Sequence, residues 1–137
     1  MVFITRRECF NAAHKLYRAE WSEAKNMEVF GACANPNWHG HNYILFVTVK
    51  GKDNPETGFV INLKELSNSI RKNIIDIVDH KNFNMDVPFM KDILPSAENI
   101  AKAFWKIMEP HVTIMGGKLH CIKLQETENN YVEYFGE

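Results

Sequence analysis

The sequence lacks the features of several specialised protein classes. Its 137 residues include only three cysteines, an odd number without paired spacing, which argues against a disulfide framework, so a reducing compartment is expected. No apolar run is long enough to span a membrane, and Met1–Ile4 is too short for the apolar core of a signal peptide. A formal net charge of −1 provides no basic field for nucleic acid or an anionic membrane. We expect a cytoplasmic protein with neither kind of partner.

The remaining composition is that of an ordinary globular domain. Hydrophobic residues make up 45% of the chain and charged residues 24%. The sequence has no internal repeat, low-complexity segment or linker, so residues 1–137 are expected to form one domain. Because the net charge is close to zero, a negatively charged substrate would have to be met by local positive groups.

Two helices are indicated by apolar spacing. Asn62 is a plausible N-cap for the first, which should end near Val78, and Ser96 caps the second, which Pro110 should stop. A shorter helix is expected near Ser22–Val29. The residues expected to face the core are Leu63, Leu66, Ile70, Ile74 and Ile77 in the first helix, and Ile100, Phe104 and Ile107 in the second.

Apolar and β-branched runs predict four main strands around these helices. They cover residues 2–14, 40–50, 118–127 and 131–135, and residues 59–61 could pair back as a short fifth segment. The order strand, strand, helix, helix, strand, strand predicts an α+β fold, a four-stranded antiparallel sheet with both helices on one face. One face and both edges of that sheet would be uncovered, and free edges favour association with another chain.

The clearest chemical signal is the run His39-Gly40-His41 at the start of a predicted strand. Side chains alternate along a strand, so the two imidazoles share a face and could hold one metal ion. His14 at the end of the first strand would be a third ligand. Three histidines with one open position are typical of catalytic Zn²⁺. The alternative is a polar strand start with chance histidines.

Cys33 lies in the loop that leads to these histidines. A thiol near a metal cation can become a thiolate, and therefore a base or nucleophile, whereas the alternative is an inert packing residue. The loop belongs to a long excursion, residues 15–38, and long loops in compact domains are usually functional. Cys9 and Cys121 lie in strand-like runs, where packing is the expected role.

The motifs together resemble the 6-pyruvoyl-tetrahydropterin synthase family. The resemblance begins with Phe10-x-Ala12-Ala13-His14 and Cys33-x5-His39-Gly40-His41-Asn42-Tyr43. It continues in family order, over nearly the whole chain, through Thr57-Gly58-Phe59-Val60, Asp79-His80-Lys81-Asn82, Glu98-Asn99 and Glu126-Thr127-x-Asn129-Asn130. The combination is much more specific than any one motif.

The resemblance implies a fold, an assembly and a reaction. The fold would be the tunnelling fold, in which three subunits close a barrel and two trimers stack into a homohexamer. The enzyme would be a zinc-dependent lyase that converts 7,8-dihydroneopterin triphosphate to 6-pyruvoyl-tetrahydropterin, for tetrahydrobiopterin biosynthesis. Triphosphate is eliminated and the side chain is oxidised internally, so no redox cofactor is needed.

The resemblance also assigns roles to individual residues. Cys33 would take a side-chain proton, Asp79 and His80 would relay protons, and Glu126 would accept hydrogen bonds from the pterin ring. Ser96 and Glu98 match a pterin-contacting region. Without the resemblance, Asp79 would be read as a helix-end residue, Glu126 as a solvated charge, and Ser96 as a helix cap.

Departures from the family pattern leave rival functions open. Trp38, in place of a small residue before the His-Gly-His run, could narrow the pocket or stack on the ligand; Asn11 and Ala97 also depart. One rival is 6-carboxy-tetrahydropterin synthase of queuosine biosynthesis, which usually has three residues between the cysteine and the His-Gly-His run. This chain has five, as in the animal-type pyruvoyl enzyme. The other is a non-catalytic pterin- or metal-binding protein.

Overall fold

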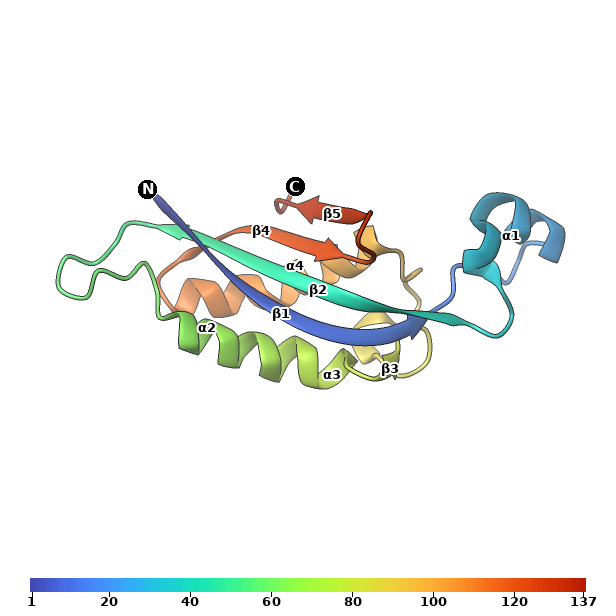
Figure 1. The fold of residues 1–137 in the computed structure, drawn as a ribbon, viewed down its shortest axis with the longest axis horizontal. Coiled ribbons are helices and arrows are strands. Elements are labelled where there is room, and N and C mark those ends of the chain that lie inside the picture. The colour runs from blue at the N-terminus through green and yellow to red at the C-terminus, as the bar shows by residue number, and fades with distance from the viewer.

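A computed structural model describes all residues from Met1 to Glu137 as an α+β structure with one five-stranded sheet (Figure 1). The strand order across the sheet is β3-β1-β2-β4-β5. The strands are β1 (Val2–His14), β2 (His39–Gly51), β3 (Lys81–Asn82), β4 (Lys118–Gln125) and β5 (Tyr131–Tyr134).

Two long helical segments lie on the same face of the sheet (Figure 1). None of the helices combines the length and the hydropathy that crossing a membrane requires. The helices are α1 (Glu23–Phe30), α2 (Leu63–Ile70), α3 (Asp76–Val78) and α4 (Ala97–Ile114), with a π-helical turn at Arg71–Ile75 that joins α2 to α3, and 3₁₀ turns at Gly31–Ala34 and Pro88–Met90.

The expected four-stranded antiparallel sheet is present, with one addition. β1 pairs with β2, β2 with β4, and β4 with β5, all antiparallel. The added strand is β3, which pairs with Ala12 and Ala13 of β1 in the parallel direction. Sequence patterns did not indicate it, because two residues are too few to show an alternation.

The short strand predicted at residues 59–61 is wrong. This segment closes a loop instead, in which the N–H of Asn54 donates to the carbonyl of Phe59 at 2.8 Å. The N–H of Gly58 donates to the carbonyl of Asn54, and Gly58 has a φ of 73°, which favours glycine. The side chain of Phe59 is more than half exposed, whereas Ile61 is buried in the core, so the segment is anchored by its side chains and not by strand pairing.

The first long helix begins at the predicted N-cap and then changes geometry. Leu63, predicted to face the core, is exposed instead. The Asn62 side chain accepts a hydrogen bond from the N–H of Lys64 at 2.9 Å, so it is the N-cap. The π-helical turn has more residues per turn than an α-helix. The next residue to face the core after Ile74 is therefore four positions later and not three. Val78 is therefore fully buried in place of the predicted Ile77, which is half-buried.

The second long helix does not stop at Pro110, so that prediction is wrong. α4 continues through Pro110 to Ile114. A proline inside a helix removes one hydrogen bond and costs about 3 kcal/mol. Met108 and Val112, on either side of it, are fully buried, and burying each such side chain contributes about 1.5–3 kcal/mol. Packing of the helix therefore offsets the local defect.

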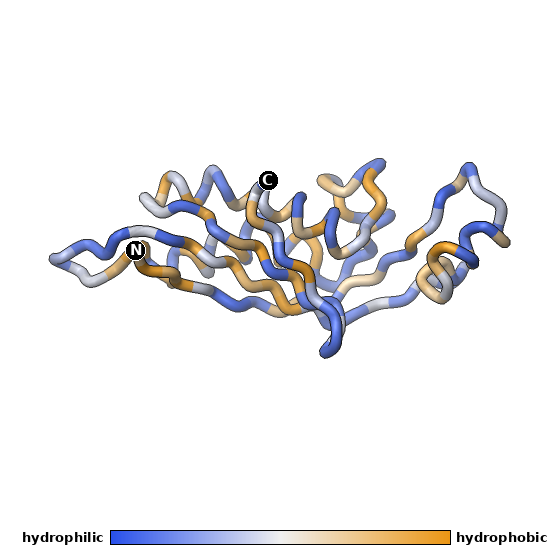
Figure 2. The backbone as a smooth tube through the Cα atoms, turned by 90° about the horizontal axis from the view of Figure 1, so that it is seen from above, coloured by the Kyte–Doolittle hydropathy of each residue, from blue (hydrophilic) through white to orange (hydrophobic).

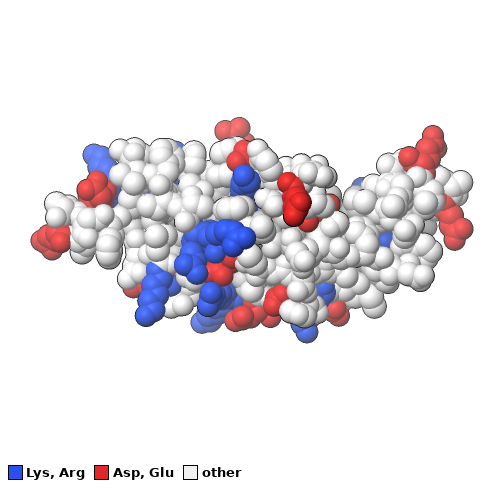
Figure 3. Space-filling model, viewed as in Figure 1, with Lys and Arg blue, Asp and Glu red and all other residues white.

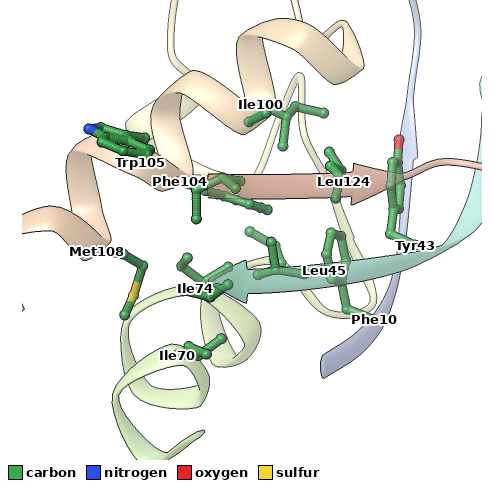
Figure 4. Packing of buried hydrophobic residues seen from close by; sticks show 14 of the residues in the cluster. Phe10, Tyr43, Leu45, Ile70, Ile74, Ile100, Phe104, Trp105, Met108 and Leu124 are labelled. Atoms are coloured by element: carbon green, nitrogen blue, oxygen red, sulfur yellow. The ribbon is translucent and has the colours of Figure 1, made fainter. Parts of the chain in front are cut away.

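The core lies between the sheet and the long helices. Leu45 of β2 and Leu124 of β4 pack beside Ile74 and Phe104, and all four are fully buried (Figure 4). Hydrophobic and hydrophilic residues alternate along the strands and helices (Figure 2), as expected for elements with one buried face.

The chain between β1 and β2 leaves the sheet as an excursion that contains α1. It extends beyond the end of the two strands in both views (Figures 1 and 2). Ser22 caps α1 by accepting from the N–H of Lys25 at 3.2 Å. The buried amide of Asn26 holds the excursion together, since it accepts from the N–H of Arg18 and donates to its carbonyl. This organised loop brings Cys33 back toward the strand end.

Candidate functional site

Three histidines converge where β1 and β2 begin to separate. His14 is the cross-strand partner of His39, and Ala12 is the partner of His41, so all three imidazoles project from one sheet face. Their ring centroids lie 4.5–5.1 Å apart. One ligand nitrogen from each lies within 4.8 Å of the others, a spacing at which the three can hold one metal ion.

The hydrogen bonding of these rings fits a cation. The Nδ1–H of His14 donates to the carbonyl of Pro95 at 2.8 Å, which leaves Nε2 as a free lone pair. That Nε2, both ring nitrogens of His39 and Nε2 of His41 are buried without any hydrogen-bond partner. Buried polar atoms are rarely left unpaired. A metal ion would satisfy one nitrogen of each ring.

Burial keeps the imidazoles of His14 and His41 in the form that binds metal. It lowers the pKa of His14, and the neighbouring His39 lowers it further. The pKa of His41 is lowered for the same two reasons. Both rings are therefore neutral near pH 7, and neutral imidazole is the metal-ligating form.

Glu126 lies beside the histidine cluster, immediately after β4. One carboxylate oxygen is 3.5 Å from Nε2 of His41 and the other is 4.0 Å from Nε2 of His14. A tight turn fixes this position, because the Thr127 hydroxyl accepts from the N–H groups of Asn129 and Asn130. The predicted turn in the Glu-Thr-x-Asn-Asn motif is thus confirmed.

The three residues predicted to contact the pterin line one pocket. Ser96, Glu98 and Glu126 surround a volume of about 280 Å³, together with Leu16 and Tyr131 among others. The Ser96 hydroxyl also accepts from the N–H of Asn99 at 3.3 Å, so it is the α4 N-cap as well. The carboxylate of Glu126 therefore borders both the pocket and the metal site.

Cys33 lies in the 3₁₀ turn that follows α1. Its carbonyl accepts from the N–H of Leu16 at 2.8 Å, which ties the loop to the end of β1. Burial raises the pKa of the thiol, and the Glu126 carboxylate raises it further. A thiolate near pH 7 therefore needs an opposing positive charge, which a cation at the three histidines would supply.

Asp79 and His80 form a pair at the outer edge of β1. Asp79 accepts from the N–H of Asn11 at 3.0 Å, and this bond is the largest cause of its lowered pKa. Its second oxygen lies 3.1 Å from Nδ1 of His80. His80 has a φ of 60°, and its side chain is 75% exposed.

The Asp79–His80 pair makes no hydrogen bond or ion pair with Cys33, Glu126 or the three histidines. His80 lines a shallow pocket of about 500 Å³ to which Asn11, Asn42 and the metal-site residue His41 also contribute. The side chains of Asn11 and Asn42 alternate with the histidines along the strands and project from the opposite sheet face. Within one chain, the Asp79–His80 pair is therefore not bonded to Cys33 or Glu126, although its pocket reaches His41.

Sequence reasoning missed two residues that support the site. Tyr43 is fully buried, with its hydroxyl 3.5 Å from Nδ1 of His14, and its ring stacks on that of Phe10 at 4.9 Å. The two-residue period after His41 could have indicated it. Pro95 acts through its carbonyl alone, which side-chain patterns do not reveal.

Comparison with protein families and solved structures gives a consistent result. The family described as 6-pyruvoyl tetrahydropterin synthase matches residues 3–137. The 6-pyruvoyl tetrahydrobiopterin synthase of Homo sapiens is 42% identical over 98% of this chain and 91% of its own length. The solved Caenorhabditis elegans 6-pyruvoyl tetrahydropterin synthase superposes with a TM-score of 0.89 at 34% identity, over 99% of this chain and 96% of that one.

The rival enzyme class is more distant. The 6-carboxy-5,6,7,8-tetrahydropterin synthase of Bacillus subtilis is 28% identical over 78% of this chain and 73% of its own length. Both the identity and the coverage are lower than for the pyruvoyl enzymes, in agreement with the spacing between Cys33 and His39.

Proposed function

The chain belongs to the 6-pyruvoyl tetrahydropterin synthase family, and from this premise we propose that it converts 7,8-dihydroneopterin triphosphate to 6-pyruvoyl-tetrahydropterin. The observation that carries the proposal is the convergence of three imidazoles, each with a buried ring nitrogen that has no hydrogen-bond partner, with Glu126, beside a pocket lined by Ser96 and Glu98. The carbon–oxygen bond to the triphosphate breaks, so the enzyme is a lyase. The electrons that the side chain loses pass to the ring, so no external oxidant is required.

The metal is proposed to be Zn²⁺, held by His14, His39 and His41. Three neutral imidazole ligands that leave a fourth coordination position open suit zinc. When bound, zinc would act as a Lewis acid toward the substrate's side-chain oxygens and would stabilise the charge that develops when carbon-bound protons leave.

The protein side chains divide the remaining work. Glu126 presents two acceptor oxygens to the N–H groups of the pterin ring, and Ser96 and Glu98 border the same pocket. Cys33 is the base that takes a proton from the substrate side chain. In the Asp79–His80 pair, the carboxylate fixes one tautomer of the imidazole, which leaves the other ring nitrogen free to move a proton.

The protein is proposed to act as a homohexamer made of two trimers. The separation of the Asp79–His80 pair from Cys33 within one chain supports association, because both groups have to reach one substrate. β1 has a strand partner on its outer edge only at Ala12 and Ala13, so most of that edge can pair with another subunit. A cytoplasmic location remains part of the proposal.

The proposal is tested by product identification. Purified, zinc-loaded protein is incubated with 7,8-dihydroneopterin triphosphate, and the pterin product and released triphosphate are identified by mass spectrometry. One triphosphate for each 6-pyruvoyl product is expected. A 6-carboxy product would support the rival enzyme, and binding without turnover would support the non-catalytic alternative.

A further inference from the structure

One lysine side chain is held at the end of the strands that carry the three histidines. His14 and His39 are the last cross-strand pair of β1 and β2. Lys15 follows His14 in the sequence, and Trp38 precedes His39. The ammonium of Lys15 lies 4.3 Å from the ring centroid of Tyr17 and 5.6 Å from that of Trp38. Two aromatic faces therefore hold this cation near the end of the strands that carry the three histidines.

The ammonium has no carboxylate partner. None of the ion pairs of the protein includes Lys15. Its backbone is nevertheless fixed, because Asn84 accepts from the N–H of Lys15 and donates to its carbonyl, both at 2.9 Å. A fixed cation without a counter-charge is suited to bind an anion.

Trp38 adopts a backbone conformation that is costly for its residue type. Its φ is 66°, in the left-handed region where glycine is favoured. Its N–H donates to the carbonyl of Asn35 at 3.3 Å and closes a turn. Strain of this kind persists where the surrounding structure requires it, and it is concentrated at functional sites. The indole ring is therefore kept beside Lys15 at the expense of a more relaxed turn.

A cavity of about 440 Å³ adjoins this cluster. Lys15, Tyr17 and Arg18 line one side, and Ala34, the residue after Cys33, lines another. Glu23 is the only acidic lining residue. The volume is within the range of small-molecule sites. The cavity thus connects two cations with the loop that carries the proposed catalytic base.

We propose that this cavity binds the phosphate chain of the substrate, with Lys15 as the anchoring cation and Trp38 as the residue that positions it. The inference rests on the proposed function, because a triphosphate is the part of that substrate that the pterin pocket and the metal leave without a partner. Trp38 is then a specificity residue that favours the phosphorylated pterin.

Binding of inorganic triphosphate to the metal-loaded protein tests the role of Lys15. By calorimetry at low ionic strength, Lys15→Met should weaken this binding at least tenfold, the usual effect of losing a charge-assisted contact, and Lys15→Arg should largely restore it. Lys25→Met is the matched control, because Lys25 lies 4.1 Å from the Trp21 ring centroid and outside the cavity lining. Equal binding by Lys15→Met and wild type overturns the proposal.

Variants of Trp38 test the positioning role. Trp38→Phe should keep triphosphate affinity, and Trp38→Gly should lose about as much as Lys15→Met although it relieves the strained turn. In turnover assays Trp38→Gly should raise KM and leave kcat within about twofold, since ground-state contacts are lost. Unchanged triphosphate affinity in Trp38→Gly would contradict the role.

A phosphate-free ligand separates this inference from the proposed function. Neopterin should bind Lys15→Met and wild type equally, because Glu126 and the metal ligands are untouched. If the proposed function fails, no pyruvoyl product forms, whereas triphosphate binding still reports on the cavity. If wild type binds neopterin and forms product but does not bind inorganic triphosphate in a Lys15-dependent way, only the cavity assignment is wrong.

Discussion

The imidazole of His39 is the most direct single-residue test of the metal site. Both of its ring nitrogens are buried without a partner, and the residue lies outside the hydrophobic core. His39→Ala should therefore lower metal content and turnover together, while the melting temperature of the metal-free protein changes by only a few degrees. Elemental analysis checks the loss, with His120→Ala as a control. Full zinc content in His39→Ala would refute the ligand assignment.

Cys33 can be tested as a base apart from its role in packing. Cys33→Ala leaves the three histidines and Glu126 in place, so the protein should bind zinc and the pterin. The turnover should fall by about 10²–10⁴-fold, the usual contribution of a positioned general base. Cys33→Ser should recover little activity, because a hydroxyl is much harder to deprotonate than a thiol.

Three measurements distinguish the three possible roles of Cys33. A base affects turnover, a packing residue affects melting temperature, and a fourth zinc ligand affects metal content. Cys9→Ala is a suitable control, since Cys9 is exposed and its thiol is remote from the cluster in the strand register. Near-normal turnover in zinc-replete Cys33→Ala would falsify the base assignment and transfer the proton chemistry to His80.

At the scale of secondary-structure elements, a buried charge joins β1 to the first long helix. Glu8 is buried and accepts from the Ser67 hydroxyl at 2.7 Å, from Nε of Arg6 at 2.9 Å and from Nε of Arg71 at 3.3 Å. Burial alone would raise the pKa of Glu8, but these three hydrogen bonds outweigh it, and the pKa is lowered.

The lowered pKa of Glu8 predicts acid sensitivity. A carboxyl whose pKa is lower in the folded state stabilises the fold above its unfolded pKa, about 4.5. That stabilisation is lost as the pH falls below this value and through the folded pKa. The free energy of unfolding in urea should fall between pH 5 and about pH 3, and less steeply in Glu8→Gln. An identical slope in Glu8→Gln would contradict this account.

The elements differ in how far their sequence could predict them. The caps Asn62 and Ser96 were predictable, because capping depends on a local side chain and two or three following residues. The π-helical turn at Arg71–Ile75 and the continuation of α4 past Pro110 were not. Both depend on burial against the sheet, which local propensity does not record.

The candidate site shows the same division. The histidines were predictable because strand alternation and one cross-strand pair bring them together. The exposed position of His80 at the edge of β1 was not, since it follows from the two-residue strand β3. The position of the Trp38 ring beside Lys15 was not predictable either, because it depends on a left-handed backbone conformation at Trp38. Tryptophan rarely adopts that conformation, so the sequence does not indicate it.

At the scale of the whole molecule, the sheet face opposite the helices carries charged side chains among apolar ones. Arg7, Phe46 and Lys123 are cross-strand neighbours there, and basic side chains gather near the middle of the view in Figure 3. A face of this kind is unsuited to a second apolar layer and is compatible with a solvent-filled barrel interior. Association through strand edges therefore fits the molecule better than face-to-face packing.

Mixed oligomers test whether two copies share one active site. Cys33→Ala and His80→Ala should each be nearly inactive alone, because each removes one of the two separated groups. If Cys33 of one copy works with His80 of a neighbour, co-expression of the two variants creates some intact sites. In these sites the His80→Ala chain supplies Cys33 and the Cys33→Ala chain supplies His80. Random mixing in equal amounts should restore activity at about a quarter of the sites. If each chain instead supplies its whole site, no site in the mixture is intact, and activity stays at the level of the single variants. Sedimentation of the mixture checks that oligomers have formed, and a 15.9 kDa species alone would contradict the shared site at the outset.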